Sequence, residues 1–470
     1  MSPGILEQLE ASARQTPQAP ALLHGEQIIS HAELQALTLA AARGLRQQGL
    51  HYGGTVGLCM QQTPLHCVTL LALLRLGALV VPIGTNLPAA ERARLARKYA
   101  IGRVLTDHEN GGIPGIPGLM LSGLSARGSE SGTDLGTPPG ADTPARLAIT
   151  SGTSGEPKAV LHNHGELLRH ALRTIGDWDG ALRLLPPRLH LTAASAAMLG
   201  TLCRSGAVVF PAGDGFDELI QAAQRYAVSH LILSPAAALA VAARLPPEGL
   251  PGLRQLRLVG GTPSQQQLEL LRQRITPQVR ITYALTELGL VALDGRVRDG
   301  AWLEVVDAQR RPLPPGHSGE IRVIADPMPL GYYRDDARAR ERFRDRWFYT
   351  GDIGSLSAEG LLRIEGRNDE LLDFGGHKLL PEVLESRLLQ HPQVRQAAVF
   401  AMAAADGAGQ LAAALVLAAD CDHSALADHC RQVLGFHDAE RVLLLDELPR
   451  NELGKVLRGE LRRLAAARRP

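Results

Sequence analysis

Apolar residues in the first part of the chain repeat with two different periods. Apolar positions three and four residues apart predict helices, and short apolar runs bounded by turn residues predict buried strands. The predicted helices are residues 30–48, 65–76 and 87–99, and the predicted strands are residues 55–60, 79–83 and 103–106. Helices that alternate with strands are typical of βαβ units and a mostly parallel sheet.

A second block with the same alternation begins after residue 164. Its predicted helices are residues 165–174, 217–226 and 236–245, and its predicted strands are residues 207–211, 230–233 and 256–259. Residues 109–144, between the two blocks, are rich in glycine, proline and serine, which predicts a surface linker. Residues 304–362 are denser in strand signals, and the remaining chain of about 100 residues carries its own βαβ pattern, enough for a small domain.

Composition narrows the class of protein. Of 470 residues, 45% are hydrophobic and 21% are charged, with a formal net charge of +1, so nothing indicates a nucleic-acid partner. The 5 cysteines are scattered without C-x-x-C spacing, which predicts neither a disulfide framework nor a zinc site and fits a cytoplasmic location. Arg75 and Gly77 interrupt the most apolar window, so we expect no membrane span. The N-terminus has no basic-then-apolar pattern, so we expect no signal peptide.

Residues 147–158, with the sequence LAITSGTSGEPK, indicate a binding site for phosphate. An apolar strand runs into a loop of hydroxyls and glycines that ends at Lys158. Glycine lets backbone N–H groups point at one place, and N–H groups, hydroxyls and an ammonium together suit a polyphosphate. Pro157 and Ala159 break the spacing of a P-loop, so this is a phosphate loop of another design. Alone, such a cluster is more often an ordinary turn.

Four further segments follow this loop in a fixed order. They are YALTE at 283–287, YTGD at 349–352, GRND at 366–369 and LPRNELGK at 448–455. With the loop, they resemble the adenylate-forming superfamily, which holds acyl- and aryl-CoA synthetases, beetle luciferases and the adenylation domains of peptide synthetases. The resemblance covers nearly the whole chain.

The resemblance implies an α/β fold with two domains. The large N-terminal domain, residues 1–368, would contain two stacked, mostly parallel sheets with helices and a small β-barrel-like part. Residues 369–470 would form a small, mobile α+β lid domain. Asp369 matches the position of the hinge between the two domains.

The resemblance also implies a reaction in two halves. A carboxylate attacks the α-phosphate of ATP and gives an acyl adenylate and pyrophosphate. A thiol, from CoA or from the phosphopantetheine of an acyl carrier protein, then takes the acyl group and AMP leaves. Positioning and charge stabilisation supply most of the rate in such phosphoryl transfers. The implied cofactors are ATP, Mg²⁺ and CoA.

The resemblance assigns nucleotide-binding roles to residues of these segments. The β- and γ-phosphates would be held by the loop residues Thr150, Ser151, Gly152, Thr153, Ser154, Gly155 and Lys158. Tyr283 would stack on adenine, Thr286 would contact the α-phosphate, and Glu287 would ligate Mg²⁺, because a carboxylate beside phosphates needs a hard cation. The alternative for the first and last of these is a core tyrosine and a solvated glutamate.

The ribose and the adenine edge are assigned to three other residues. Asp352 would accept both ribose hydroxyls with help from Arg367, and Gly261 would flank adenine and the acyl group. The alternatives are ordinary turns at Thr-Gly-Asp and Gly-Gly.

Lys455 is the residue that the resemblance implies for catalysis of adenylation. It would reach from the small domain and bridge the substrate carboxylate and the α-phosphate. The alternative is a surface lysine beside a basic C-terminal helix. A hairpin at residues 371–378, with Gly376 beside the pantetheine arm, would replace Lys455 for the thiol step. A plain β-hairpin is the alternative there.

The acyl pocket of the superfamily corresponds here to segments after residue 184, at 259–262 and at 283–286. His190 matches a position near the substrate carboxylate, although a histidine in an apolar helix is more often structural. Leu191 or a neighbour stands where amino-acid activators carry an aspartate, and an ammonium buried there unpaired would be costly. We therefore predict an aromatic or aliphatic carboxylic acid and not an amino acid.

Four functions fit these observations. An acid–CoA ligase is the leading hypothesis, and a ligase that loads a carrier protein uses the same thiol chemistry. A nucleotide-binding protein without catalysis is a remote alternative, and a luciferase-like oxidase is another.

Overall fold

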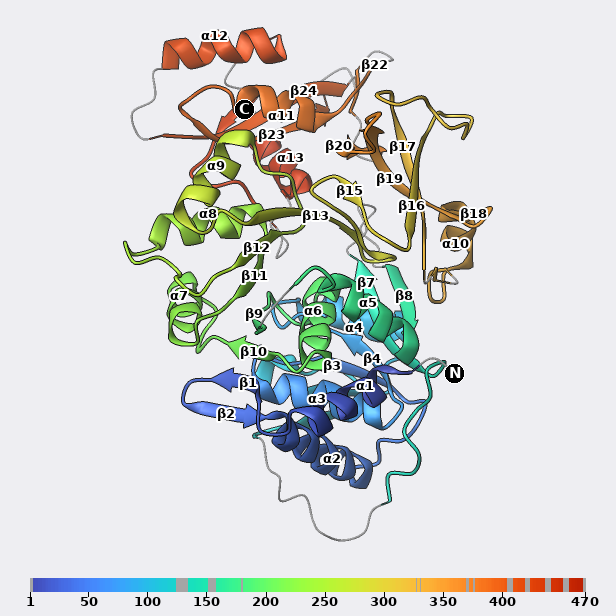
Figure 1. Ribbon diagram of the computed structural model, residues 1–470. Coiled ribbons are helices and arrows are strands. Elements are labelled where there is room, and N and C mark those ends of the chain that lie inside the picture. Colours follow the sequence, from blue (N-terminus) through green and yellow to red (C-terminus); the bar gives the residue numbers. More distant parts are fainter. Residues whose placement is uncertain are drawn as a thin grey trace.

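Two mostly parallel sheets, an antiparallel sheet and a smaller C-terminal unit follow one another along the chain. In Figure 1 the N-terminal elements lie at the bottom and the C-terminal elements at the top. The computed structural model describes residues 3–123, 134–150, 158–178, 181–326, 328–329, 331–368, 372–374, 377–403, 409–418, 423–435, 441–450 and 456–467.

The first sheet has six strands in the order β6-β5-β3-β4-β7-β8. They are β3 (Thr55–Cys59), β4 (Leu79–Pro82), β5 (Arg103–Thr106), β6 (Gly118–Met120), β7 (Pro144–Thr150) and β8 (Lys158–Asn163). Every neighbouring pair is parallel except β7 and β8, which run antiparallel. Helices α2 (His31–Gln47), α3 (Pro64–Arg75) and α4 (Ala89–Tyr99) closely match the predicted helices of the first block. Ser30 and Glu33 cap the start of α2 reciprocally.

The second sheet has nine strands in the order β15-β14-β13-β12-β11-β9-β10-β1-β2. They are β1 (Pro20–His24), β2 (Gln27–Ser30), β9 (Arg183–Leu185), β10 (Ala207–Phe210), β11 (His230–Leu233), β12 (Gln255–Leu258), β13 (Val279–Leu285), β14 (Gly289–Leu293) and β15 (Arg296–Val297). Its centre, from β13 to β1, is parallel, and its edges are antiparallel. Two stacked, mostly parallel sheets were predicted, and they are confirmed (Figure 1).

Helices of this second block are α5 (His164–Thr174), α6 (Thr192–Cys203), α7 (Phe216–Arg225), α8 (Pro235–Arg244) and α9 (Gln265–Arg274). The apolar pattern predicted α5, α7 and α8. It missed α1 (Ile5–Gln15), the β1–β2 hairpin and α9. Only two residues of α9, Leu268 and Leu271, are buried, so its apolar face is too narrow to give a clear helical period.

The predicted density of strands after residue 304 corresponds to an antiparallel sheet. It consists of β16 (Ala301–Val306), β17 (Ser318–Ala325), β18 (Phe343–Arg344), β19 (Trp347–Leu356) and β20 (Leu362–Arg367), with α10 (Asp336–Arg342) beside it. The predicted linker is only partly irregular, because η1 (Glu109–Gly111) and strand β6 lie within it.

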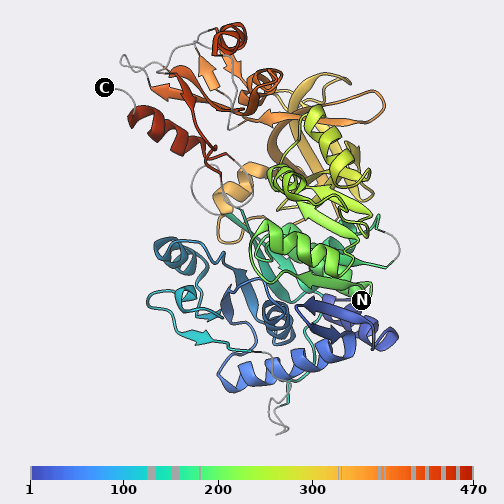
Figure 2. The ribbon, with the colours of Figure 1, turned by 90° about the vertical axis from the view of Figure 1, so that its left-hand side faces the viewer.

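The C-terminal unit lies at the top of the molecule, beside the antiparallel sheet (Figures 1 and 2). It contains β21 (Leu372–Phe374), β22 (His377–Leu379), α11 (Pro381–Leu388), β23 (Val394–Ala403), β24 (Gly409–Leu417), α12 (His423–Leu434), β25 (Val442–Leu444) and α13 (Arg458–Ala467). Strands β21 and β22 pair as the predicted hairpin, while β23, β24 and β25 form a three-stranded sheet. The hinge at Asp369 lies outside the described residues, so the predicted boundary between domains remains a prediction.

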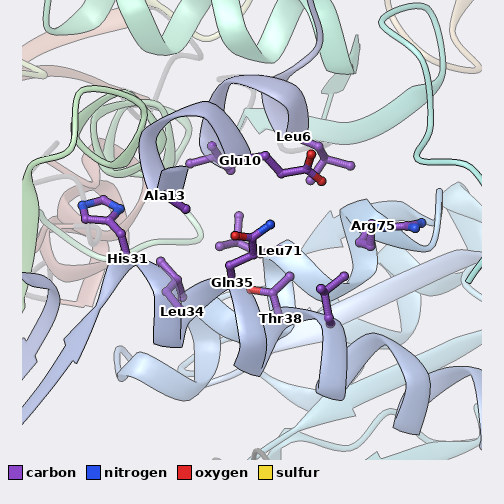
Figure 3. A pocket seen from close by; sticks show the side chains of 11 residues that line it. Leu6, Glu10, Ala13, His31, Leu34, Gln35, Thr38, Leu71 and Arg75 are labelled. Carbon is purple, nitrogen blue, oxygen red and sulfur yellow. The ribbon is translucent and has the colours of Figure 1, made fainter. Parts of the chain in front are cut away.

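Nothing in the helices that the structure describes combines the length and hydropathy needed to cross a bilayer. A groove of about 480 Å³, including space open to solvent, lies between α1, α2 and α3 (Figure 3). Its walls are mostly apolar, and its lining includes the polar side chains of Glu10, His31, Gln35, Thr38 and Arg75. None of the predicted site residues lines this groove.

Strand β7 is buried on both faces at the centre of the molecule. Leu147 packs in one core cluster with Leu79 and Val81, and Ala148 packs in another with Val160 and Leu288. A strand buried on both sides is typical of a parallel sheet covered by further layers. The end of β7 is therefore held firmly where the predicted phosphate loop begins.

Buried histidines make the stability of the fold sensitive to acid. Burial lowers the pKa of His66, His162 and His164 to about 4. An unfolded histidine titrates near about 6.5, so below that pH the unfolded chain binds protons that the folded chain does not. The contribution of these groups to stability is therefore complete above about pH 6.5 and is lost as the pH falls towards about 4.

We expect the urea midpoint of unfolding to fall steadily between about pH 6.5 and about pH 5, with each histidine contributing at most about 1.4 kcal/mol per pH unit. Equilibrium unfolding at a series of pH values measures this slope. In His164→Leu, which removes one titrating ring, the slope should be shallower than in the parent protein. A midpoint that stays constant across this range would contradict the prediction.

Candidate active site

Two predicted residues, Tyr283 and Arg367, contact the carboxylate of a third, Asp352. Tyr283 lies within β13, and Asp352 lies in β19 opposite Arg367 at the end of β20. The Tyr283 hydroxyl donates to Asp352 Oδ2 at 2.6 Å, and Arg367 Nη1 donates to Oδ1 at 2.8 Å. Burial and the Asp352 carboxylate hold the pKa of Tyr283 well above its ordinary value, so the phenol keeps its proton. Asp352, 5% exposed, is thus an oriented acceptor.

Local structure of β19 fixes the direction of this carboxylate. The Thr350 hydroxyl donates to the Ile321 carbonyl at 2.9 Å and accepts from the Asp352 N–H at 2.9 Å. Gly351 has φ +76°, and a Cβ there would lie 2.5 Å from Arg342 Nη1. Only glycine suits that position. The alternative of an ordinary turn before a strand is wrong, because Thr350, Gly351 and Asp352 belong to β19.

Glu287 is held by a residue that the sequence motifs did not identify. It lies in the turn after β13 and is 9% exposed, so the alternative of a solvated glutamate is wrong. The Tyr332 hydroxyl donates to Glu287 Oε1 at 2.6 Å. Lys158 Nζ lies 5.6 Å from the centre of the Tyr332 ring. Tyr332 therefore connects the lysine of the phosphate loop to the predicted metal ligand.

Several arginine side chains lie near Lys158. Burial, followed by Arg342 and Arg338, lowers the pKa of Lys158, while Glu287 raises it and Arg367 lowers it further. Arg342 is fixed by donation to the Tyr349 carbonyl at 3.4 Å. Cations held together against their mutual repulsion suit a ligand with several negative charges.

The loop between β7 and β8 begins and ends at paired residues. Thr150 pairs with Lys158 across the antiparallel ladder, so the two ends of the loop are adjacent. The predicted loop residues Ser151, Gly152, Thr153, Ser154 and Gly155 lie outside the described residues, as do the side chain of Thr150, Gly376 and Lys455. Their predicted roles remain predictions.

Three other predicted residues have definite places. Thr286 precedes Glu287 and is half-buried, and Gly261 lies exposed in the turn between β12 and α9. His190 was expected in an apolar helix, but it lies in the turn before α6. Its carbonyl accepts from Arg146 Nη2 at 2.9 Å. The structure thus places His190 beside Arg146.

The sequence motifs missed Tyr332, Arg338 and Arg342. The arginines at 338, 340, 342 and 344 form an alternating cationic run, which could have indicated an anion-binding surface. No such signal marks Tyr332, because its partner Glu287 is 45 residues away and only the folded chain brings them together.

A magnesium site at Glu287 fits this donor set. In the part of the chain that the structure describes, no group of three or more His, Cys, Asp or Glu side chains could hold a metal ion. Mg²⁺ usually needs only one or two carboxylates, because substrate phosphates and water complete its coordination. A single buried carboxylate among cations therefore fits a magnesium ion that arrives with ATP.

Comparison with known proteins identifies the family. The model of the AMP-binding enzyme family matches residues 9–333. The chain belongs to the AMP-binding enzyme family. The model of the AMP-binding enzyme C-terminal domain also matches, at residues 383–455. This AMP-binding enzyme is thus a member of the adenylate-forming superfamily of acyl- and aryl-CoA ligases, as its motifs predicted.

Two curated relatives of this AMP-binding enzyme match along almost their whole length. Feruloyl-CoA synthase from Amycolatopsis sp is 27% identical over 96% of this chain and 97% of the relative. 2-Succinylbenzoate–CoA ligase from Geobacillus kaustophilus is 28% identical over 97% of each chain. Among solved structures, ATP-bound MatB from Rhodopseudomonas palustris has a TM-score of 0.87 at 23% identity and covers 99% of each chain. This likeness confirms the predicted fold class.

Tyr332→Phe tests the link between Lys158 and Glu287. Phenylalanine keeps the ring but removes the hydroxyl that donates to Glu287, so we expect kcat/KM for ATP to fall about tenfold, the value of one hydrogen bond to a charged group. Steady-state pyrophosphate release measures the change. Tyr333→Phe is the matched control, because that ring packs in a different core cluster beside α4. Equal losses in both variants would remove Tyr332 from the site.

Proposed function

We propose that this AMP-binding enzyme activates a carboxylic acid with ATP and transfers the acyl group to CoA. The observation that supports this most is the Tyr283–Asp352–Arg367 cluster, which lies beside the cations around Lys158. A hydroxyl-binding carboxylate next to a cationic group matches the two polar parts of a nucleoside triphosphate. The names of the relatives, which are ligases of ferulate, indoleacetate and succinylbenzoate with CoA, support an aromatic acid and a CoA acceptor.

In this proposal the ribose hydroxyls bind Asp352, and the hydrogen bonds from Tyr283 and Arg367 keep that carboxylate charged and oriented. The phosphates bind the loop before Lys158, with Arg338 and Arg342 adding positive charge nearby. Glu287 holds the Mg²⁺ that accompanies ATP, and Thr286 contacts the α-phosphate. The acid carboxylate then lies near His190 and attacks the α-phosphorus, and pyrophosphate leaves.

Residues 369–470 complete the proposed site as a lid. Lys455 stabilises the crowded negative charge of the first half-reaction, and the β21–β22 hairpin takes its place when the thiol attacks the acyl adenylate. The thiol displaces AMP, and the new thioester is released.

A panel of acids tests the proposal. Pyrophosphate release is measured with aromatic, aliphatic and amino acids, with and without CoA, and thioester formation is measured with CoA and with a phosphopantetheinylated carrier protein. We expect release with non-amino acids and a thioester with CoA. Thioester on the carrier protein alone would shift the proposal to carrier loading. No release with any acid would overturn the adenylation chemistry.

Lys455→Ala is expected to slow adenylation by about 10²-fold or more, because removal of a preorganised charge near the transition state costs at least that much. Single-turnover pyrophosphate release with a saturating acid measures this step. Lys98→Ala is the control, since Lys98 lies on α4 beside Tyr99. Full activity of Lys455→Ala would remove this residue from the mechanism.

A further inference from the structure

Of the described residues, Arg257 and Arg146 are the most deeply buried arginines, and they differ in whether a carboxylate pairs with them. Arg257 is 1% exposed; its Nη2 lies 2.6 Å from Asp177 Oδ1, and its guanidinium lies over the Trp178 ring. Arg146 is 2% exposed and donates from Nη2 to the His190 carbonyl at 2.9 Å. Its Nη1 has no hydrogen-bond partner, and no carboxylate of the described residues forms an ion pair with it. A buried charge without a counter-ion is costly, so this guanidinium needs an explanation.

Among the described residues, the surroundings of Arg146 offer basic groups and no carboxylate that is free to pair with it. His162 is its partner across the β7–β8 ladder, and His66 is close enough for Arg146 to act on its charge. Burial, with smaller contributions that include Arg146, holds the pKa of both histidines at about 4. Asp107 also acts on His66, but its carboxylate already accepts from the Gln61 N–H and contacts His108. Arg146 is therefore a positive charge among neutral rings.

Arg146 lies near two segments that take part in the proposed reaction. Arg146 and Thr150 lie four residues apart on β7, which is about 13 Å of extended chain, and Thr150 is where the phosphate loop begins. The hydrogen bond to the His190 carbonyl places the guanidinium against the segment that precedes α6. That segment is the one assigned to the acyl pocket. Arg146 thus lies on the same strand as the start of the predicted phosphate loop and against the segment assigned to the acyl pocket.

We infer that Arg146 binds a second carboxylate at the far end of the acid substrate, so that the preferred substrates are dicarboxylic acids. This inference rests on the proposed function and names the substrate class of the same site. A guanidinium offers two parallel N–H donors to a carboxylate, and the partnerless Nη1 is available for one of them. The second carboxylate supplies the counter-ion that Asp177 supplies to Arg257.

The test compares matched pairs of acids in pyrophosphate release. Hexanedioate is paired with hexanoate, and benzene-1,4-dicarboxylate with 4-methylbenzoate, so that each pair differs in the distal charge. We expect the parent enzyme to prefer the diacid of at least one pair by about tenfold or more in kcat/KM. In Arg146→Met this diacid-to-monoacid ratio should fall by about 10²-fold, and Arg146→Lys should restore part of it.

Arg257→Met is the matched control, because it removes an equally buried guanidinium that already has a counter-ion. Its ratio should equal that of the parent enzyme even where the folded fraction is lower, since a ratio does not depend on that fraction. If Arg146→Met does not fold, the parent enzyme is tested by thermal unfolding, and the diacid should raise its Tm more than the matched monoacid does.

Three outcomes would overturn the inference. Release with monoacids and no preference for either diacid would reject it while leaving acid activation in place. An unchanged ratio in Arg146→Met, with a Tm shift equal for both members of a pair, would reject it too. No release with any acid would reject the proposed function together with this inference.

Discussion

Replacement of Asp352 by asparagine is expected to lower kcat/KM for ATP by about 10²-fold to 10³-fold. Two charge-assisted hydrogen bonds to the ribose would be weakened, each worth about 1.5–3 kcal/mol. The new amide would also present N–H groups towards Tyr283 and Arg367, which are both donors to this side chain. The variant should keep its fold, because asparagine has almost the same shape as aspartate.

Pyrophosphate release at varied ATP concentration measures this effect, and most of it should appear in KM because the ribose is far from the reacting phosphorus. Asp307→Asn is the matched control, since Asp307 lies in a surface turn and accepts from Gln309 and Arg311. A variant that binds ATP as tightly as the parent enzyme would show that the ribose lies elsewhere.

Glu287→Gln should have the other large effect, a loss of about 10³-fold in kcat at low Mg²⁺. Glutamine can still accept from the Tyr332 hydroxyl, so the turn after β13 should stay in place. It cannot supply the negative charge that a hard cation requires. It also removes a negative group that raises the pKa of Lys158, so the local positive potential increases.

A titration with Mg²⁺ distinguishes this role from a structural one. We expect the half-saturating Mg²⁺ concentration to rise in Glu287→Gln and activity to recover in part at high Mg²⁺. Glu269→Gln, on α9, is the control, because its carboxylate only accepts from Gln265 at the surface. An unchanged response to Mg²⁺ would mean that Glu287 has no contact with the metal.

The parallel part of the fold was predictable because a sheet that is covered on both faces needs strands that are apolar throughout. Such strands appear in the sequence as short apolar runs. β4 and β12 are buried throughout or nearly so, and their limits lie close to the predicted ones. Elements with a narrow apolar face gave no such signal, as α9 shows. The turn at His190 was mistaken for helix, because an apolar stretch runs through the turn and on into α6.

The site was predictable only where its residues are neighbours in the sequence. Tyr283 and Glu287 share one segment, and Asp352 follows an aromatic run, so the motifs named them. Tyr332 and Arg342 lie near Glu287 and Lys158 of the candidate site through contacts across the fold, which a local pattern cannot show. The sequence analysis did not single out Arg146, since nothing in its neighbours' identity reveals that it is buried without an ion-pair partner among the described residues.

Strand β7 contributes to both the nucleotide side and the acid side of the inferred site. One end leads into the nucleotide loop, and Arg146, four residues earlier, faces the acid in the inferred arrangement. Because the pleat of a strand fixes the spacing between its residues, the same few peptide units would set the length of acid that spans the gap. A change of side chain at position 146 would then alter which acids are accepted while the nucleotide end stays as it is. The acid selectivity of such an enzyme can therefore change while its nucleotide-binding residues stay the same.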